Sequence, residues 1–218
     1  MKMNLLLTLF IALLFSSNSC SKSQREDLFN GKDLSNWTIT LKNPEANPDS
    51  VFSVADGMIN VSGLPFGYLR TKKEYKNYRL HAEYRWIGTP TNSGIFLNAT
   101  GDDKIWPLCM ECQLMNSKAG DIILMGLTAG ITRRDTTFLS GNPEKPNIVV
   151  RKYEESSEKP AGEWNTVDIV CMEKKLEIKV NGVLQNNGAN MTLTSGSICL
   201  QSEGGPMQFR NVYVEPLN

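Results

Sequence analysis

The sequence predicts an all-β protein, a sandwich or jelly roll of antiparallel strands. Helical periodicity is nearly absent from residue 29 onward. In its place stand short runs of alternating or wholly apolar residues, separated by Gly, Pro, Asn and Asp. Many short strands with closely spaced turn signals are typical of sandwiches and jelly rolls.

The length and charge of the chain exclude several classes of protein. With 218 residues it can bury the core of one domain of moderate size, and no internal repeat or domain break is visible. The 23 basic residues balance the 23 acidic ones, so no excess charge attracts nucleic acid or an anionic membrane. Phosphate loops and dinucleotide-binding glycine patterns are absent as well. We therefore expect no nucleic-acid partner.

Residues 1–20 have the pattern of a secretory signal peptide. Lys2 supplies the positive start, and the apolar run over residues 5–15 is too short to span a bilayer. The small residues before Cys20 resemble a lipoprotein cleavage site, in which this cysteine becomes the lipidated first residue. Ser17 stands where that motif usually has leucine. Simple secretion is the alternative.

The mature chain then divides into two parts. Residues 21–27 are polar, which predicts a short tether, and residues 28–218 form a single jelly-roll domain. We expect an exported protein, a periplasmic or outer-membrane lipoprotein, which contacts the membrane only through its lipid anchor.

Four cysteines remain after Cys20, and an exported protein with an even number of them invites disulfides. Cys109 and Cys112 are three residues apart on a predicted strand, hence roughly 10 Å apart and on opposite faces. They are too far apart to bond to each other. A zinc site lacks a second cysteine pair and has one histidine to draw on. We expect buried free thiols, and a bridge between distant strands, for example one involving Cys112, stays open.

The strand pattern can be followed along the whole chain. Asp56-Gly57 and Asn181-Gly182 are two-residue turn signals, each between two strand-like runs. Residues 133–160 carry prolines and many charges, which indicates a long loop that is either functional or simply variable. The predicted strands cover residues 51–54, 58–61, 68–71, 78–86, 109–114, 122–125, 130–132, 148–150, 164–171, 175–180, 183–185, 197–202 and 207–214.

The stretch over residues 77–116 is the most informative part of the chain. Its first run alternates between an apolar face and an ionisable face, the latter with Arg79, His81, Glu83 and Arg85. A later run, residues 109–114, repeats the arrangement: Met110, Cys112 and Leu114 alternate with Glu111 and Gln113. If the two runs lie in one sheet with their polar faces together, the surface suits a sugar. A solvated sheet face would show the same pattern one strand at a time.

Short motifs follow one another at residues 29–37, 68–71, 83–86, 92–96, 111–114, 119–121, 162–166, 180–182 and 209–212. In this order they resemble the 3-keto-disaccharide hydrolase family, and the resemblance covers about residues 27–217. The resemblance implies a concanavalin A-like jelly-roll sandwich of two antiparallel sheets, with sugar bound on a concave face. It also implies an enzyme that cleaves glycosides already oxidised to a ketone at C3.

The chemistry of such a substrate defines the side chains to look for. A C3 ketone acidifies the C2 proton, because the carbanion is delocalised as an enolate. The elimination at C1 and the later addition of water need a general base, a donor to the enolate oxygen and a proton for the departing oxygen. We expect catalysis by Glu111 as first choice of base, by His81 as second choice, and by Glu83. Expected substrate-binding residues are Arg85, Asn92, Trp106, Gln113 and Glu203.

Several alternatives stay open beside this interpretation. Glu83 and Arg85 can form cross-strand ion pairs on a wet surface, and His81 can face solvent. Trp37, Trp86 and Trp164 fit a core better than a binding platform. No cofactor is certain, although a carboxylate-rich site can take a divalent metal. The alternative function is a non-catalytic carbohydrate-binding lipoprotein that uses the same concave face. The acidic motif of laminarinase-type retaining hydrolases is missing.

Overall fold

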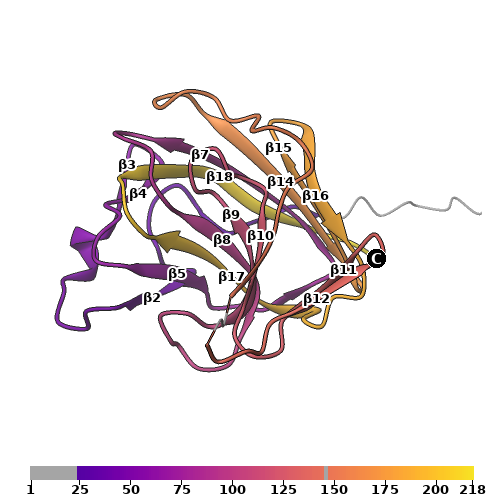
Figure 1. Ribbon diagram of the computed structural model, residues 1–218. Helices are drawn as coiled ribbons and strands as arrows, with labels where there is room; N and C mark the ends of the chain where they lie inside the picture. The colour runs from indigo at the N-terminus through magenta and orange to yellow at the C-terminus, as the bar shows by residue number, and fades with distance from the viewer. Residues whose placement is uncertain (1–23, 145–146) are drawn as a thin grey trace, which may run out of the picture.

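The computed structural model describes residues 24–144 and 147–218. Two eight-stranded antiparallel sheets pack face to face, and a separate two-stranded hairpin lies beside them. In Figure 1 the strands of the first sheet run across the upper part of the view, and those of the second sheet lie below them. The predicted all-β sandwich of antiparallel strands is confirmed. Within the described residues, one short 3-10 helix, Pro48–Ser50, precedes β3.

The first sheet is built around a long strand near the middle of the chain. The order across this sheet is β16 (Val183–Gly188), β15 (Lys175–Val180), β14 (Asn165–Met172), β7 (Tyr78–Trp86), β18 (Met207–Pro216), β4 (Met58–Val61) and β3 (Phe52–Ala55), with β1 (Glu26–Asp27) also paired to β18.

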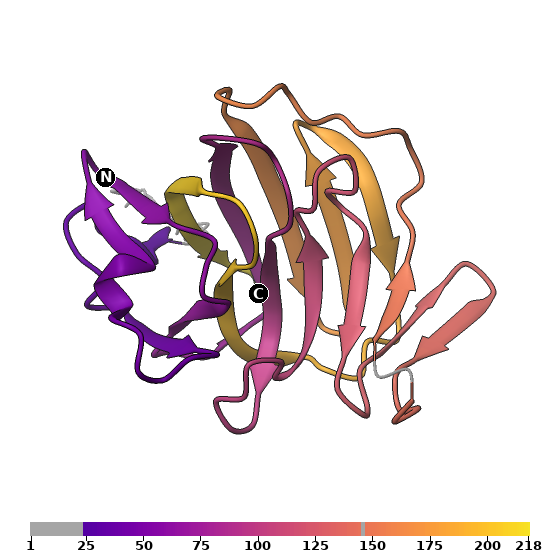
Figure 2. The same cartoon turned by 60° about the vertical axis from the view of Figure 1, so that its left-hand side comes forward.

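The second sheet contains the remaining large strands. Its order is β13 (Ile148–Val150), β10 (Ile122–Met125), β9 (Leu108–Gln113), β8 (Gly94–Thr100), β17 (Ser195–Ser202), β5 (Gly67–Thr71) and β2 (Trp37–Leu41), with β6 (Tyr75–Lys76) also paired to β17. The two-stranded hairpin consists of β11 (Gly130–Arg133) and β12 (Thr136–Leu139), and Figure 2 shows it standing out from the sandwich at the lower right.

The main core lies between the two sheets. Alternate side chains of β7 are buried there, as the two-residue period predicts, and Tyr84 and Trp86 are among the largest fully buried residues. From the other sheet, Met110 and Cys112 of β9 enter the same core. Removing these surfaces from water is the dominant stabilising term for a sandwich of this kind.

A second apolar cluster lies on the opposite face of the second sheet. It is covered by residues 101–107, which connect β8 to β9 and reach across to β5: the Tyr68 hydroxyl donates to the Lys104 carbonyl oxygen at 2.8 Å. Arg70, also from β5, donates to the Asp103 carboxylate at 2.8 Å. This cover loop therefore shelters one end of the sheet face. The cluster comprises Tyr68, Phe96, Ala99, Cys109, Ile123, Met125 and Cys199.

Both predicted two-residue turns are confirmed. Asp56 and Gly57 have φ values of 51° and 72°, and they join β3 to β4. Asn181 and Gly182 have φ values of 50° and 79°, and they join β15 to β16. Two successive positive φ angles match the right-handed twist of the flanking strands, and Asn, Asp and Gly tolerate them best.

The structure departs from the predicted strands at several places. Strands β2 and β8 cover residues 37–41 and 94–100, which lie outside the predicted strand ranges. Strand β12 lies inside the segment 133–160, where the sequence indicated a loop with one strand. Glu26 and Asp27, expected in the tether, pair with Val214 and Tyr213 of β18, so ordered pairing begins before residue 28. A two-residue strand carries too little periodicity to be recognised from the sequence.

The cysteines behave as expected. Cys109, Cys112, Cys171 and Cys199 are free and buried. Cys112 belongs to the main core and Cys109 to the second cluster, so the two lie on opposite faces of β9. The predicted signal peptide and Cys20 lie outside the described residues. In the part of the chain that is described, no helix is long and apolar enough to cross a membrane.

One expectation about the sheets is wrong. Strands β7 and β9 do not share a sheet: β7 lies between β14 and β18 of the first, and β9 between β8 and β10 of the second. Because the apolar faces of both strands point into the shared core, their polar faces point away from each other on opposite outsides of the sandwich. Alternation within a strand reveals which side is buried, but not which sheet the strand joins.

Candidate functional site

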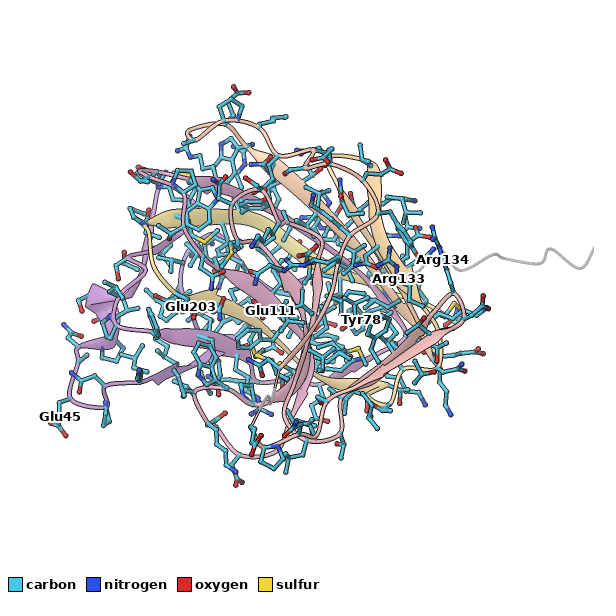
Figure 3. All side chains as sticks on the ribbon, in the orientation of Figure 1. Glu45, Tyr78, Glu111, Arg133, Arg134 and Glu203 are labelled. Carbon is cyan, nitrogen blue, oxygen red and sulfur yellow. The ribbon has the colours of Figure 1, made fainter. Side chains whose placement is uncertain are left out.

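A hollow of about 220 Å³ opens on the outer face of the second sheet, next to the covered cluster. It contains five of the eight expected catalytic and substrate-binding residues, and Figure 3 labels two of them, Glu111 and Glu203. The lining residues are Asn92, Trp106, Glu111, Gln113, Ile123, Met125, Asn147, Val149, Gln201 and Glu203.

Strand pairing brings these residues together from distant parts of the sequence. In the second sheet β8 lies between β9 and β17, so residues near 94, 111 and 201 become neighbours. Glu111 is paired with Phe96 on one side and with Ile123 of β10 on the other. Glu203 follows the end of β17, and its backbone forms an antiparallel bridge with Asn92.

Gly94 makes room for the Glu111 side chain. A Cβ atom at position 94 would lie only 1.9 Å from Oε1 of Glu111 and 2.7 Å from its carboxyl carbon. Gly94 lies within a regular strand, so glycine is needed here for space and not for an unusual backbone conformation. The carboxyl group therefore lies directly over the backbone of β8.

The Glu111 carboxyl is almost completely withdrawn from water. The residue is 4 % exposed, and its Oε1 atom is buried without a hydrogen-bond partner. Burial, and secondarily the negative charge of Glu203, raise the pKa of Glu111 to about 8. A carboxyl group in this environment carries its proton at neutral pH, and strongly perturbed carboxyls are concentrated at functional sites.

Glu203 has a different environment in the same hollow. Its Oε2 atom accepts hydrogen bonds from the side-chain amides of Asn92, at 2.8 Å, and Gln201, at 2.7 Å. Burial raises the pKa of Glu203, and the hydrogen bond from Gln201 opposes this shift. The two carboxyl groups of the hollow thus differ in how well their ionised forms are stabilised.

Three buried oxygen atoms around the hollow lack donors: Oδ1 of Asn92, Oε1 of Gln201 and Oε1 of Glu111. Both amides are oriented by the hydrogen bonds that their N–H groups donate to Glu203. A buried polar atom without a partner costs about 1–3 kcal/mol, so a ligand that supplies hydroxyl donors gains by filling these positions. Within residues 24–144 and 147–218, no residue that lines the hollow carries a positive charge.

Gln113 and Trp106 complete the hollow in different ways. Gln113 uses its side-chain oxygen within the protein, because Oε1 accepts from the backbone N–H groups of Leu114, at 3.0 Å, and Met115, at 2.9 Å. Trp106, at the end of the cover loop, is 37 % exposed and its ring centroid lies 6.4 Å from that of Phe66. An exposed indole beside the buried carboxyl of Glu111 is a platform on which a sugar ring can stack.

His81 and Glu83 lie on the other outside of the sandwich. The His81 Nδ1 atom is 2.8 Å from a carboxylate oxygen of Asp168, and its ring stacks on Tyr213 with centroids 4.9 Å apart. Burial opposes ionisation of Glu83, but hydrogen bonds from Asn211 and Arg210 outweigh it and hold the pKa of Glu83 below its ordinary value. The structure therefore does not bring His81 or Glu83 to Glu111.

Arg85 belongs to the same outer surface as His81 and Glu83. Its Nε atom donates to the Gln208 side-chain oxygen at 2.8 Å, and its guanidinium lies 4.6 Å from the ring of Trp164. Arg210 contacts the same ring at 4.0 Å. Trp164 is thus half-buried on this surface and not in the core, whereas Trp37 and Trp86 are buried as expected. Cross-strand pairing, the alternative that the sequence left open, describes Glu83 with Arg210.

Sequence reasoning missed several residues of the hollow. Gln201 stands two positions before Glu203, a spacing that puts both side chains on one face of a strand, and this signal was available. Ile123, Met125, Asn147 and Val149 carry no chemical signature and become neighbours only through the pairing of β9, β10 and β13.

Two larger hollows lie along the edge strand β16, but they are weaker candidates. Their volumes are about 760 and 540 Å³, and Arg134 and Asn187 contribute to both. None of their lining residues has a buried polar atom without a partner. The smaller hollow around Glu111 has three such atoms and is therefore the stronger candidate for a binding site.

The described residues contain no cluster of side chains that suits a divalent metal. Across residues 24–144 and 147–218, no three His, Cys, Asp or Glu side chains gather closely enough to hold an ion. Divalent-metal binding therefore stays an untested expectation.

Comparison with known proteins identifies the family and the fold. The sequence profile of the family described as 3-keto-alpha-glucoside-1,2-lyase-like domain matches residues 24–215. A structure described as "putative glycosyl hydrolase" from Parabacteroides distasonis is 22% identical, with a TM-score of 0.62, over 89% of this chain and 100% of that one. No match was found among curated proteins.

More distant structures share the concanavalin A-like jelly roll. A Bacillus licheniformis β-glucanase is 11% identical, with a TM-score of 0.57, over 91% of this chain and all 100% of that chain. A carbohydrate-binding module from Bacillus subtilis is 9% identical, with a TM-score of 0.57, over 83% of this chain and 95% of the module. The expected fold is therefore confirmed. One of these relatives is named as an enzyme and the other as a binding module, so the fold leaves both classes open.

Proposed function

Because this chain belongs to the family of 3-keto-α-glucoside-1,2-lyase-like domains, we propose that it cleaves glycosides whose sugar ring carries a ketone at C3. The reaction takes place in the hollow around Glu111 and proceeds by removal of the C2 proton, elimination at C1 and addition of water. The observation that carries this proposal is the pair of carboxyl groups, Glu111 and Glu203, in one sheltered hollow.

The pair matches the needs of an elimination. Proton removal at C2 and proton delivery to the departing oxygen require two groups that exchange protons near neutral pH. Glu111, with its pKa raised to about 8, and Glu203, whose pKa is also raised, titrate closer to that range than ordinary carboxyls. A covalent nucleophile is not required, which agrees with the missing acidic motif of retaining hydrolases.

The remaining side chains of the hollow suit a sugar ring. The unpaired oxygens of Asn92 and Gln201 accept hydrogen bonds from ring hydroxyls, and the exposed indole of Trp106 stacks on the apolar side of the ring. The volume of about 220 Å³ is below the range of most small-molecule sites, so the hollow takes one ring and leaves the rest of the substrate outside.

The test is turnover of methyl 3-keto-α-glucoside, whose leaving group is an alcohol, by the purified protein. We expect cleavage by the wild type and a loss of at least about a hundredfold in kcat/KM for Glu111→Gln, since acid–base groups contribute about 10²–10⁴-fold. Glu45→Gln is the matched control, because Glu45 is exposed and Figure 3 shows it far from the hollow. Equal activity of the wild type and Glu111→Gln would contradict the proposal.

The second candidate is a carbohydrate-binding protein without turnover. The three unpaired buried oxygens favour sugar binding whether or not a bond is broken. Calorimetry with the 3-keto-α-glucoside separates the two: binding that Asn92→Leu weakens, with no product formed by the wild type, supports this candidate over the enzyme.

We also propose that the protein is exported and anchored through a lipid on Cys20. The apolar run over residues 5–15 and the small residues before this cysteine support the proposal. Cells that express the protein should incorporate labelled fatty acid into it, and Cys20→Ser should abolish the label. A wild-type protein without label would leave simple secretion as the better explanation.

A further inference from the structure

We propose that the two carboxyl groups of the hollow have opposite roles: Glu203 is the base that takes the C2 proton, and Glu111 is the acid that protonates the departing oxygen. This inference rests on the proposed function and assigns a separate role to each carboxyl group of the same site. It reverses the sequence-based preference for Glu111 as base.

The first observation concerns the hydrogen bonds of Glu203. Its Oε2 atom accepts two amide N–H groups, from Asn92 at 2.8 Å and from Gln201 at 2.7 Å. Donors aimed at a carboxylate stabilise its ionised form relative to the neutral one. Glu203 is the carboxyl of the pair that can hold a negative charge in the resting enzyme.

The second observation is that Glu111 has no such support. Its Oε1 atom is buried without a partner, and the carboxyl lies over Gly94 and between Phe96 and Ile123 on the neighbouring strands. These neighbours are apolar and offer no side-chain donor. An unsupported buried carboxyl is most stable with its proton on, because the neutral form loses less hydration.

The charges around the two carboxyl groups also favour a proton on Glu111. Burial, and then the charge of Glu203, raise the pKa of Glu111 to about 8. The thiols of Cys109 and Cys199 and the hydroxyl of Tyr68 lie on the same face, and burial raises their pKa values, so they stay neutral. Arg70, from β5 on this face, is paired with the Asp103 carboxylate at 2.8 Å. Among the described residues, none that lines the hollow is cationic. Two neighbouring carboxyls without a cation share one proton, and the amides place that proton on Glu111.

The chemical step balances with this assignment. The Glu203 carboxylate takes the C2 proton, and the C–H electron pair forms the enolate of the C3 ketone. The enolate then re-forms the ketone while a C1–C2 double bond appears and the C1–O bond breaks. The departing oxygen takes the proton of Glu111 and leaves as an alcohol.

The return half of the cycle restores both groups. Glu111, now ionised, removes a proton from water as its oxygen adds to C1, and Glu203 returns a proton to C2. The net reaction is hydrolysis, and neither carboxyl is consumed. In this scheme Asn92 and Gln201 are positioning residues, which act on the reaction through Glu203.

Proton exchange separates the two roles from each other and from the proposed function. The probe is 1,5-anhydro-3-ketoglucitol, which has an acidic C2 proton but no glycosidic oxygen at C1. In deuterium oxide, proton NMR follows the loss of the C2 signal. We expect Glu203→Gln to slow exchange at least about a hundredfold and Glu111→Gln to leave it within about tenfold of the wild type.

Leaving-group dependence checks the acid. A nitrophenolate departs without a proton, whereas an alkoxide needs one. Glu111→Gln should therefore lose at least about a hundredfold on methyl 3-keto-α-glucoside but less than about tenfold on the 4-nitrophenyl glycoside. Glu203→Gln should lose activity on both substrates. Circular dichroism and thermal unfolding confirm that both variants are folded.

Each result has a defined consequence. If Glu111→Gln loses the exchange of the C2 proton and Glu203→Gln keeps it, the assignment of base and acid is overturned, while the proposed function stands. A wild type that neither exchanges the C2 proton nor cleaves either glycoside overturns the proposed function, and the assignment with it.

The positioning residues have their own signature. Gln201→Leu removes a donor from the Glu203 carboxylate, so the pKa of this base rises and the acidic limb of the kcat/KM profile moves to higher pH. A loss of activity at all pH values without movement of this limb would mean that Gln201 is merely structural. Gln201→Glu adds a charge and is therefore unsuitable as a control. Lys72→Leu, on the exposed surface, is the control instead.

Discussion

At the scale of single residues, the hollow depends on a close fit between a glycine and a glutamate. Gly94 has no Cβ, and this allows the Glu111 carboxyl to lie against the backbone of β8, where Oε1 has no partner. A buried polar atom without a partner costs stability, because it has lost its hydrogen bonds to water. Proteins keep strained or unsatisfied groups mainly where function needs them.

The pH dependence of stability should reveal Glu111. Its pKa is about 8 in the folded protein and 4.5 in the unfolded chain, so unfolding releases a proton between these pH values. Stability is therefore lost as pH rises through this window, by up to roughly 5 kcal/mol at 1.36 kcal/mol per unit. Glu111→Gln should lack this loss. Urea unfolding of both proteins at pH 5 and pH 8 measures it.

The matched control for this experiment is Glu45→Gln, which alters an exposed carboxyl. It should follow the wild type at both pH values. An equal pH dependence in the wild type and in Glu111→Gln would show that the carboxyl ionises freely in the folded protein.

At the scale of elements, the cover loop over residues 101–107 defines one wall of the hollow. The loop is attached to β5 by the Tyr68 hydroxyl and by Arg70, whose Nη1 atom also donates to the Gly101 carbonyl at 3.1 Å. Trp106 stands at the end of this loop and lines the hollow. The position of the indole is thus set by contacts with a strand that itself contributes nothing to the hollow.

Arg70→Met should loosen the cover loop. The change removes the charge-assisted hydrogen bonds to Asp103 and Gly101, worth about 1.5–3 kcal/mol, so local opening should become at least about tenfold more frequent. Amide hydrogen exchange in residues 101–107 measures this opening. Arg79→Met, at an exposed pair with Glu215 on the other sheet, is the control and should leave that exchange unchanged. Equal protection in both variants would rule out the anchoring role.

At the scale of the whole molecule, the two sheets separate two polar surfaces. The hollow with Glu111 opens on the outside of the second sheet, and His81, Glu83 and Arg85 lie on the outside of the first. The polar side chains on the first sheet form hydrogen bonds with one another: Arg210 and Asn211 donate to Glu83, and Arg85 donates to Gln208. A whole core separates it from the hollow.

Substitutions on the first sheet should therefore spare activity. His81→Phe and Glu83→Gln should change kcat/KM for a 3-keto-α-glucoside by less than about threefold, because neither side chain reaches the hollow. Steady-state kinetics beside Glu111→Gln measures the contrast. A loss of a hundredfold in either variant would place the reaction on the other face of the sandwich.

Much of the fold could be predicted from the chain, because alternation and turn residues are local. The strand over residues 78–86 and the Asn181-Gly182 turn both appear in the structure as expected. The hollow was partly predicted: Glu111, Asn92, Gln113, Trp106 and Glu203 do gather. The expectation that β7 and β9 share one polar surface was wrong, because the same alternation occurs on both sheets and does not distinguish one outer face from the other.

The sequence by itself determined most of the strands and which side of each of them is buried, since a two-residue period leaves the backbone no other way to bury its apolar side chains. It did not reveal β2, β8 or β12. Only the tertiary structure decided which polar faces share a surface. Pairing across the sheet places Gln201 and Glu203 beside Glu111 and assigns His81 and Glu83 to the far side. That choice depends on contacts between segments far apart in the chain, and no local pattern encodes them.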